Sequence, residues 1–231
     1  MLITHRTSAY IKQQDTPLSR ILYRVAKWFI YGQLPDLAWI YRPIYVLYRL
    51  VSFGLQRLPI IFLYLPIQQA RLEHYCPGLS LKNGFPLIQG PIKVFIGDNT
   101  CLNGALSIHG HPDSGSCEIR IGENRYIEWQ TGISVGKKVL IGDNVMIAGR
   151  ASINAHSGHS PGLDKYQPPI MADLVIEDDV LICTGVHIVK PVTIGRGSVV
   201  ASGCVVTGDV LPNVLFAGNP GKVIRTLRGN E

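Results

Sequence analysis

The stretch of sequence that decides the fold runs from Ile176 to Val206 and reads IEDDVLICTGVHIVKPVTIGRGSVVASGCVV. An aliphatic residue recurs at every sixth position within it, at Ile176, Ile182, Ile188, Ile194, Val200 and Val206. A helix would repeat its apolar positions about every 3.6 residues and a strand every 2 residues, so neither element alone explains this period. The regular six-residue spacing indicates an internal structural repeat.

The same six-residue frame is present in three earlier stretches, 96–108, 121–133 and 141–153. A glycine often follows the aliphatic residue directly, as at Gly97, Gly122, Gly142 and Gly195. This pattern is typical of short strands separated by tight turns, with three hexads forming one triangular coil. The inward aliphatic side chains of one coil would stack on those of the next. We therefore predict an all-β fold, a parallel β-helix of about five coils.

Two stretches interrupt the period, 109–118 and 155–174. Their residues cannot continue the stacked core, so we expect both stretches to leave the β-helix as protruding loops. Loops on a rigid scaffold commonly carry function. The second stretch contains two histidines, His156 and His159, and the first begins with His109 and His111.

The N-terminal region differs from the rest of the chain in charge and composition. The 231 residues include 22 Lys and Arg, 16 Asp and Glu, and 46% hydrophobic residues, which excludes a disordered or collagen-like chain. Residues 1–75 hold nine basic and three acidic side chains, and so account for the whole net charge of +6. Of the 19 aromatic residues, 13 also lie there. We predict a helical region over 1–78 and a β-helix over 79–231, with a C-terminal tail from 210.

The N-terminal pattern predicts amphipathic helices that begin near Thr16 or Ser19. We expect prolines to break these helices, at Pro35, Pro43 and Pro59. The longest charge-free apolar run, 58–66, is about half of the roughly 20 residues that a transmembrane helix needs. Two interpretations of residues 1–75 stay open: the helices cover a flank of the following domain, or their basic and aromatic side lies on an anionic membrane surface.

Other features narrow the partners and the compartment. No helix-turn-helix, zinc or RNA-recognition signature accompanies the basic residues, so we expect no nucleic acid as a partner. The cysteines are odd in number and form no C-x-x-C pair, which suits neither a disulfide framework nor a zinc ribbon. The N-terminus lacks the pattern of a signal peptide. We expect a cytoplasmic protein, with peripheral contact at the inner membrane face as an option.

Three features together resemble the left-handed β-helix acyltransferases. They are the hexads, the segment INAHSGH at 153–159, and an ending that contains VTGDVLP at 206–212 and AGNPGKVIR at 217–225. The resemblance covers about 90–228 and is strongest to the maltose and galactoside O-acetyltransferases and to those of bacterial surface polysaccharides. It implies a left-handed β-helix, acetyl-CoA as the donor, no metal, and a homotrimer with active sites between subunits.

Acetyl transfer to a hydroxyl needs a base that removes the hydroxyl proton, and histidine suits that role. The resemblance implies that His156 or His159 is this base. His156 is favoured because it keeps an ungapped offset from Ile147 and Ile153, similar to relatives with a His-x-His loop. A shift of one residue in the loop would align His159 instead, and both residues could also be ordinary surface histidines.

The resemblance also implies residues that contact the two substrates. Thr184, Ser202 and Thr207 would contact the pantetheine arm of acetyl-CoA. Lys222 and Arg225 would bind its phosphates, as basic side chains commonly do. The alternative for these two residues is a solvated basic tail.

On the acceptor side, Trp129 could stack on a sugar ring and Glu128 could accept a hydrogen bond from a sugar hydroxyl or orient the base. Packing in a subunit interface is the favoured alternative for Trp129.

These implications define the functional hypothesis: an acetyl-CoA-dependent O-acetyltransferase that acts on a carbohydrate, either a bacterial surface polysaccharide or its lipid-linked precursor. One alternative is a γ-type carbonic anhydrase-like enzyme with zinc bound by His156, His159 and either His187 or His109. Another is a non-catalytic β-helix scaffold.

Overall fold

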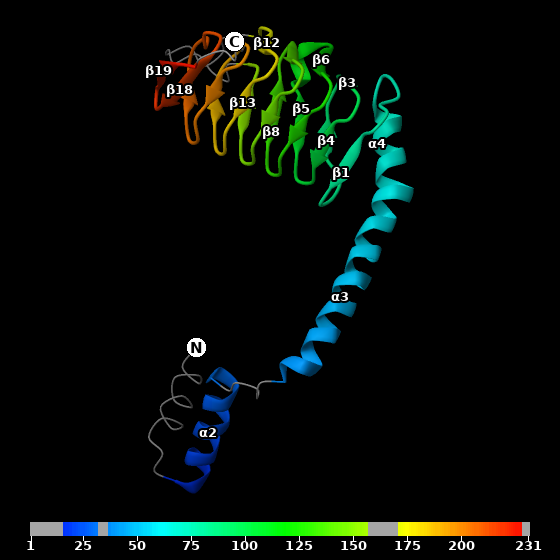
Figure 1. Cartoon of the computed structure of the whole chain (residues 1–231), viewed down its shortest axis with the longest axis vertical. Helices are drawn as coiled ribbons and strands as arrows, with labels where there is room; N and C mark the ends of the chain where they lie inside the picture. The colour runs from blue at the N-terminus through cyan, green and yellow to red at the C-terminus, as the bar shows by residue number, and fades with distance from the viewer. Residues whose placement is uncertain (1–15, 32–36, 157–170, 228–231) are drawn as a thin grey trace. The chain divides into compact units, whose positions relative to one another are not determined.

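The computed structural model describes residues 16–31, 37–156 and 171–227 of the chain (Figure 1). By their contacts the residues divide into two compact units, Met1–Gly54 and Leu55–Glu231. The unit that contains the β-strands therefore begins before residue 79, the predicted boundary. It takes in a helical segment because Ile60 and Gln68 are buried and the Arg71 guanidinium donates a hydrogen bond to the carbonyl oxygen of Ile92, at 2.9 Å.

The first described helix, α2 (Pro17–Tyr31), begins where the sequence predicts. The Ser19 N–H donates to Thr16 Oγ1 at 3.2 Å, and the Thr16 N–H donates to Ser19 Oγ at 3.1 Å. This reciprocal pair caps donors that the first turn would leave unsatisfied. Pro17 occupies the first helical position, where the missing N–H costs nothing.

The second helical segment is longer than predicted, and the expectation that Pro43 and Pro59 break it is wrong. Helix α3 (Ala38–Pro59) continues through Pro43 and is followed by the π-helix η1 (Ile60–Tyr64) and by α4 (Leu65–Arg71). The change to π-helical geometry directly after Pro59 shows that the chain adjusts its pitch there and does not stop. Pro35 lies outside the described residues.

The continuous helical segment Ala38–Arg71 has 34 residues and a mean hydropathy of 1.6 over its most apolar window, enough to cross a membrane by length and composition alone. Only 6% of that window is buried within the structure. The charge-free run 58–66 is only part of this helical segment, so the segment is longer than we predicted from that run.

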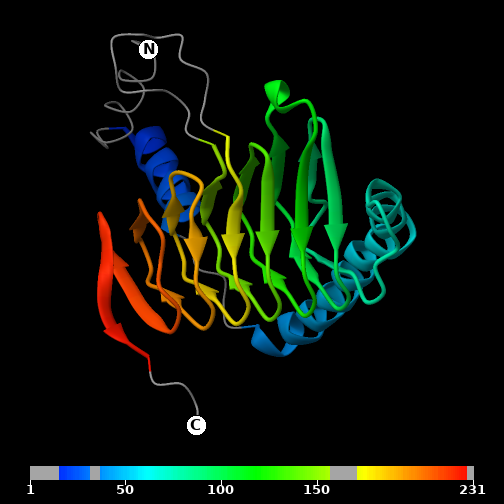
Figure 2. The same ribbon diagram turned by 90° about the horizontal axis from the view of Figure 1, so that it is seen from above.

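Three parallel sheets form the β-solenoid, and Figure 2 shows the strands of successive coils stacked side by side. Sheet A contains β1 (Ser80–Lys82), β4 (Cys101–Asn103), β7 (Tyr126–Ile127), β10 (Met146–Ile147), β13 (Leu181–Ile182), β16 (Val199–Val200), β18 (Val214–Gly218) and the antiparallel β19 (Gly221–Thr226). Sheet B contains β2 (Leu87–Gln89), β5 (Ser107–Gly110), β8 (Gly132–Val135), β11 (Ser152–Asn154), β14 (His187–Ile188) and β17 (Val205–Val206). Sheet C contains β3 (Ile92–Ile96), β6 (Cys117–Ile121), β9 (Lys138–Ile141), β12 (Leu174–Ile176) and β15 (Thr193–Ile194). The predicted β-helix of about five coils is confirmed.

The six-residue period places each repeated aliphatic side chain in a column inside the solenoid. In sheet A, Ile147 lies in register with Ile127 on one side and Ile182 on the other, and all three are buried. The side chains that alternate with them, such as Met146, face outward. Because each coil buries its aliphatic face against its neighbours, the core is one continuous stack along the solenoid.

The corner between sheets C and A is built from a left-handed turn in each coil. Asn99, Asn124, Asn144 and Asp179 occupy equivalent positions with φ of 56°, 56°, 56° and 60°, a conformation that asparagine and aspartate tolerate better than most residues. The coils also approach closely here: a Cβ at Gly142 would lie 2.7 Å from the backbone nitrogen of Asp178. At Gly142 this close approach leaves no room for a side chain.

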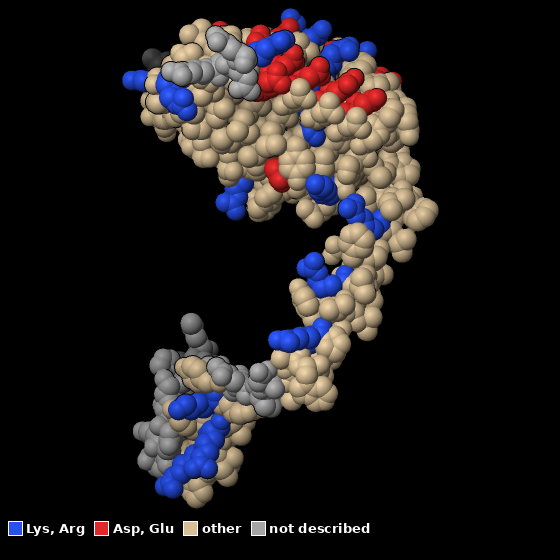
Figure 3. All heavy atoms as spheres, viewed as in Figure 1, with Lys and Arg blue, Asp and Glu red and all other residues tan. Residues whose placement is uncertain are grey.

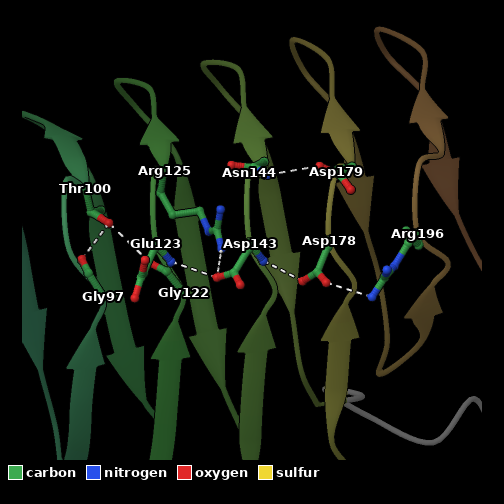
Figure 4. A network of polar contacts seen from close by, with 10 residues as sticks. All are labelled: Gly97, Thr100, Gly122, Glu123, Arg125, Asp143, Asn144, Asp178, Asp179 and Arg196. Carbon is green, nitrogen blue, oxygen red and sulfur yellow. Dashed lines mark hydrogen bonds and ion pairs between the residues drawn. The ribbon is translucent and has the colours of Figure 1, made fainter. Parts of the chain in front are cut away.

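Charged side chains link the coils along this corner (Figure 4). The Glu123 N–H donates to Asp143 Oδ1 at 2.9 Å, and the Asp143 N–H donates to Asp178 Oδ1 at 2.6 Å. The Arg125 side chain is buried and donates from Nη2 to Asp143 Oδ1 at 2.6 Å. Burial lowers the pKa of Arg125, and the charge of Asp143 opposes that shift. Arg125 thus occupies an inward position that a valine fills in the next two coils, Val145 and Val180.

The first predicted loop is shorter in the structure than in the sequence prediction, and the predicted tail contains two strands. Strand β5 extends to Gly110 and β6 begins at Cys117, so the first excursion is only 111–116, with the short 3₁₀ turn η2 (Pro112–Ser114) in it. A bridge between His156 and Met171 closes the base of the second excursion, whose residues 157–170 lie outside the described part. Within the predicted C-terminal tail from 210, β18 and β19 form an antiparallel hairpin.

Candidate active site

The candidate site lies at the corner where sheet B turns toward sheet C. Three residues follow β5, β8 and β11 at equivalent positions in successive coils: His111, Gly136 and His156. A Cβ on Gly136 would lie 2.5 Å from the carbonyl oxygen of Ala155 and 3.1 Å from the Cβ of His156. The missing side chain lets two rings from coils that are not adjacent meet. The ring centroids of His111 and His156 lie 4.9 Å apart with an interplanar angle of 66°.

The imidazole of His156 is held from one side by a serine of the preceding coil. Its Nε2 lies 2.7 Å from Ser134 Oγ, a hydrogen-bond distance. Its Nδ1 is buried and has no hydrogen-bond partner among the described residues. Burial lowers the pKa of His156 below the ordinary value of 6.5, and the neighbouring His111 lowers it further. At neutral pH the ring is therefore uncharged and has one nitrogen that can accept a proton.

This geometry suits general base chemistry. A neutral imidazole can take a proton from a hydroxyl or amine as that group attacks a carbonyl carbon. The contact with Ser134 restricts rotation of the ring and fixes which edge it presents, as orienting hydrogen bonds of catalytic histidines do. The second predicted base, His159, lies outside the described residues.

The predicted acceptor residues Glu128 and Trp129 lie at the other end of sheet B, at the corner between sheets A and B. Glu128 Oε2 accepts a hydrogen bond from Asn103 Nδ2 at 2.7 Å. Trp129 is 43% exposed, and the guanidinium of Arg150 lies 5.3 Å from its ring centroid. Strand β8 separates these residues from the corner of His156, so the structure does not bring them together within one chain.

The predicted acetyl-CoA residues are divided among three places. Thr184 and Ser202 lie in neighbouring coils at the corner between sheets A and B, where the Gly203 N–H donates to the Thr184 carbonyl oxygen at 3.0 Å. Thr207 follows β17 at the end of sheet B, on the side of the His156 corner. Lys222 and Arg225 are exposed on β19 at the edge of sheet A.

Ser134 and His111 also belong to the candidate site. The sequence did not predict that these two residues would lie beside His156. Both have a signal in the period. Ser134 follows Ile133 as Asn154 follows Ile153, and His111 lies three residues after Ile108 as His156 lies three after Ile153. Aligning the ends of the hexads would have placed the two histidines in one column.

A groove lies along sheet C, and His156 is not among the residues that line it. This groove has a volume of about 760 Å³. Its floor contains Phe95, Leu140 and Val175, and its rim contains Arg120, Glu123, Asp143, Glu177, Asp178 and Arg196. Within the described part of the chain, no group of three His, Cys, Asp or Glu side chains is arranged to hold a metal ion.

The fold and the corner define a class of protein: a parallel β-solenoid of hexad coils with a neutral histidine where a loop leaves the coil. Comparison with known families agrees with this class. The family model described as "Bacterial transferase hexapeptide (six repeats)" matches residues 173–208. This match spans β12 to β17 and shows that these coils carry the hexapeptide repeat of that model.

Individual relatives show how far the similarity extends. The chain is 48% identical over 61 residues to the 2,3,4,5-tetrahydropyridine-2,6-dicarboxylate N-acetyltransferase of Clostridium perfringens (strain SM101), which is 26% of this chain and 26% of that protein. The match thus spans about a quarter of the relative's length. AntD, an N-acyltransferase from Bacillus cereus, shares the fold with a TM-score of 0.59 and 16% identity over 71% of this chain and 87% of AntD. A maltose O-acetyltransferase from Clostridium difficile 630 is 26% identical over 66% of this chain and 71% of that chain, with a TM-score of 0.46.

Proposed function

We propose that this protein transfers an acetyl group from acetyl-CoA to a hydroxyl of a carbohydrate, with His156 as the general base. The proposal rests on the protonation state and the position of His156. Its side chain is partly buried, uncharged at neutral pH and in contact with Ser134, and it lies where the second excursion leaves the solenoid. The transferase repeat and the match to an N-acetyltransferase support acyl transfer as the reaction class.

The proposed step balances without a metal or redox partner. His156 removes the proton of the acceptor hydroxyl as its oxygen attacks the carbonyl carbon of the acetyl thioester. A tetrahedral intermediate forms, and its collapse breaks the carbon–sulfur bond. The protonated imidazole returns the proton to the departing thiolate, which leaves as free CoA. Since the attacking oxygen must reach His156 and the thioester at once, we expect both substrates at the corner between sheets B and C.

An amine acceptor is the second candidate, because the curated relatives in Clostridium perfringens and Staphylococcus aureus are named N-acetyltransferases. The same base would serve an amine, which must also lose a proton. A screen of amino sugars against their hydroxyl counterparts distinguishes the two. The proposed carbohydrate acceptor is overturned if acetyl is transferred only to nitrogen.

We also propose that the active protein is a homotrimer with sites between subunits. The separation of the predicted residues within one chain supports this arrangement. Glu128, Trp129, Thr184 and Ser202 lie at a different corner from His156. In a trimer, that corner of one subunit can face the His156 corner of another. Sedimentation equilibrium measures the stoichiometry, and a monomer that turns over at full rate would contradict the arrangement.

Acetyl-CoA binding tests the proposed function most directly. In titration calorimetry the full-length protein should bind acetyl-CoA with a Kd between about 1 μM and 1 mM, the range of roughly −8 to −4 kcal/mol. Replacing both Lys222 and Arg225 by alanine removes charge-assisted contacts to phosphate and should weaken binding at least about tenfold. The matched control replaces Lys82 and Lys93, which are exposed on β1 and β3 of the solenoid, and should leave the Kd unchanged. If both double variants weaken acetyl-CoA binding equally, the effect comes from the general positive charge. Lys222 and Arg225 are then not the phosphate ligands.

The pH dependence of turnover follows from the pKa of His156. Because burial and then His111 lower that pKa below 6.5, kcat/KM should hold its plateau as the pH falls through 6.5 and decline only below it. His111→Asn removes the smaller of the two causes, so the acid limb should move upward but stay below 6.5. The same shift makes the folded state bind fewer protons than the unfolded state. Its contribution to stability is complete above 6.5 and is lost as the pH falls toward the lowered pKa. An acid limb unmoved in His111→Asn would exclude the proposed coupling.

A further inference from the structure

We propose that α2 and α3 bind the surface of an anionic lipid bilayer and lie in its plane, with aliphatic side chains in the acyl boundary and cationic side chains at the level of the headgroups. This interaction is separate from the chemistry at His156, and neither proposal depends on the other. It chooses between the two interpretations that the sequence left open for the N-terminal region.

The cations of α3 lie on one side of the helix. Arg42, Arg49 and Arg57 are spaced by seven and eight residues, which places them within a sector of about 80° at 100° per residue. In Figure 3 the blue side chains follow one flank of this helix. Long arginine side chains can keep their charge in water while their methylene stems cover apolar surface.

The opposite side of α3 carries an unbroken aliphatic stripe. Its members recur at helical spacing: Ile44, Leu47, Val51, Leu55 and Leu58. Every one of them is more than half exposed, from 52% at Val51 to 66% at Leu55, and no described residue of α3 is buried. A soluble monomer rarely exposes an apolar surface of this extent, so the stripe indicates a binding surface.

Helix α2 repeats the same arrangement independently. Arg20, Arg24 and Lys27 lie within a sector of about 60°. Leu18, Leu22 and Val25 occupy the opposite side, and their exposed fractions are 59%, 39% and 49%. Two separate helices of this chain therefore present cations on one side and exposed aliphatic side chains on the other.

Charge and aromatic content favour lipid as the occupant. The sequences of α2, α3, η1 and α4 contain no Asp or Glu, so their charge is entirely positive and complementary to anionic headgroups. Trp39 and several tyrosines project from α3, and Trp39 is 75% exposed. Tryptophan and tyrosine are enriched where one end of a side chain is apolar and the other meets water.

The arginine spacing favours an in-plane helix over a spanning one. The longest part of Ala38–Arg71 without an arginine runs from 58 to 70. This is shorter than the about 20 residues that cross the hydrocarbon core, so any spanning placement would bring at least one arginine into it. An in-plane helix leaves every arginine at the headgroup level.

The experiment is sedimentation of the purified full-length protein with phosphatidylcholine vesicles, with and without phosphatidylglycerol. We expect binding to the anionic vesicles that weakens with salt. The variant Arg24→Gln, Arg42→Gln, Arg49→Gln should partition about 100-fold less, at roughly 1 kcal/mol for each cation. The matched control, Lys93→Gln, Lys137→Gln, Lys138→Gln, removes the same charge from the solenoid and should partition as the wild type does.

A second measurement separates the in-plane from the spanning placement. In a Trp28→Phe, Trp129→Phe variant only Trp39 fluoresces, and lipids brominated near the headgroup should quench it more than lipids brominated deep in the chain. Equal binding to neutral vesicles with no effect of the glutamine changes would overturn the proposal. The proposal would also be overturned if the protein did not bind vesicles and self-associated instead, and if changing Leu47 and Val51 to glutamine abolished that self-association. Urea unfolding of the same samples, followed by circular dichroism, shows whether the solenoid is intact.

Discussion

His156→Asn should lower kcat by about 100- to 10,000-fold, the range over which a positioned general base accelerates proton transfer. Asparagine is polar but shorter than histidine: its amide ends at the level of Nδ1, so the contact between Ser134 Oγ and Nε2, 2.7 Å in the structure, is lost together with the base. Asparagine cannot accept a proton at neutral pH. Release of free CoA, followed with a thiol reagent in the presence of the acceptor that a screen identifies, measures the loss.

Two controls make this result specific. Titration calorimetry should give the variant a Kd for acetyl-CoA within about twofold of the wild type, because a base acts on the transition state and not on donor binding. His187→Asn changes an exposed histidine on β14 of the same sheet and should leave kcat unchanged. Full turnover by His156→Asn would transfer the role of base to another residue, with His159 the first to test.

Ile147→Ala should lower the free energy of unfolding by about 2 to 5 kcal/mol, the usual range for truncating a buried isoleucine. Ile147 is completely buried between Ile127 and Ile182 in the column of sheet A. Truncation would leave a cavity that touches three coils, since stacked coils cannot move independently to fill it. Urea unfolding followed by circular dichroism measures the change.

Met146→Ala is the matched control because Met146 precedes Ile147 on the same two-residue strand but is 49% exposed. Its truncation should change the free energy of unfolding by no more than about 0.5 kcal/mol, as is usual for surface positions. Similar losses for both variants would mean that the strand and not the buried column determines the stability of this coil.

The hexad period was enough to predict the solenoid because the buried aliphatic residues recur at the same six-residue spacing as the strands of each coil. Residues such as Ile147 could be placed inside without any knowledge of the hand or the turns. Arg125 could not: it occupies the position of Val145 and Val180, and the carboxylates around it, above all Asp143 in the next coil, become visible as partners only in the structure.

The helical region shows a different limit of the sequence argument. The propensity of proline to end helices predicted breaks at Pro43 and Pro59, yet α3 continues through Pro43 and η1 takes up the change after Pro59. A single missing donor is a local cost, and it does not decide whether the remaining turns stay helical.

The site was predicted only in part, because its residues come from coils that loops separate in the sequence. His156 was identified, whereas its neighbours Ser134 and His111 were not connected with it. Glu128 and Trp129 were placed beside it on the strength of the resemblance, and in one chain they lie at another corner. A resemblance can transfer the type of a residue without telling which copy of the chain supplies it.

The antiparallel strand β19 has a consequence for self-assembly. A parallel coil ends in a row of backbone donors and acceptors that match the start of another coil, so two solenoids could in principle join end to end and grow into a fibril. Because β19 pairs with β18 in the opposite direction, it occupies that row in sheet A and offers exposed Lys222 and Arg225 in its place. The hairpin therefore blocks the end-to-end pairing of solenoids along sheet A and so limits the length of the repetitive fold.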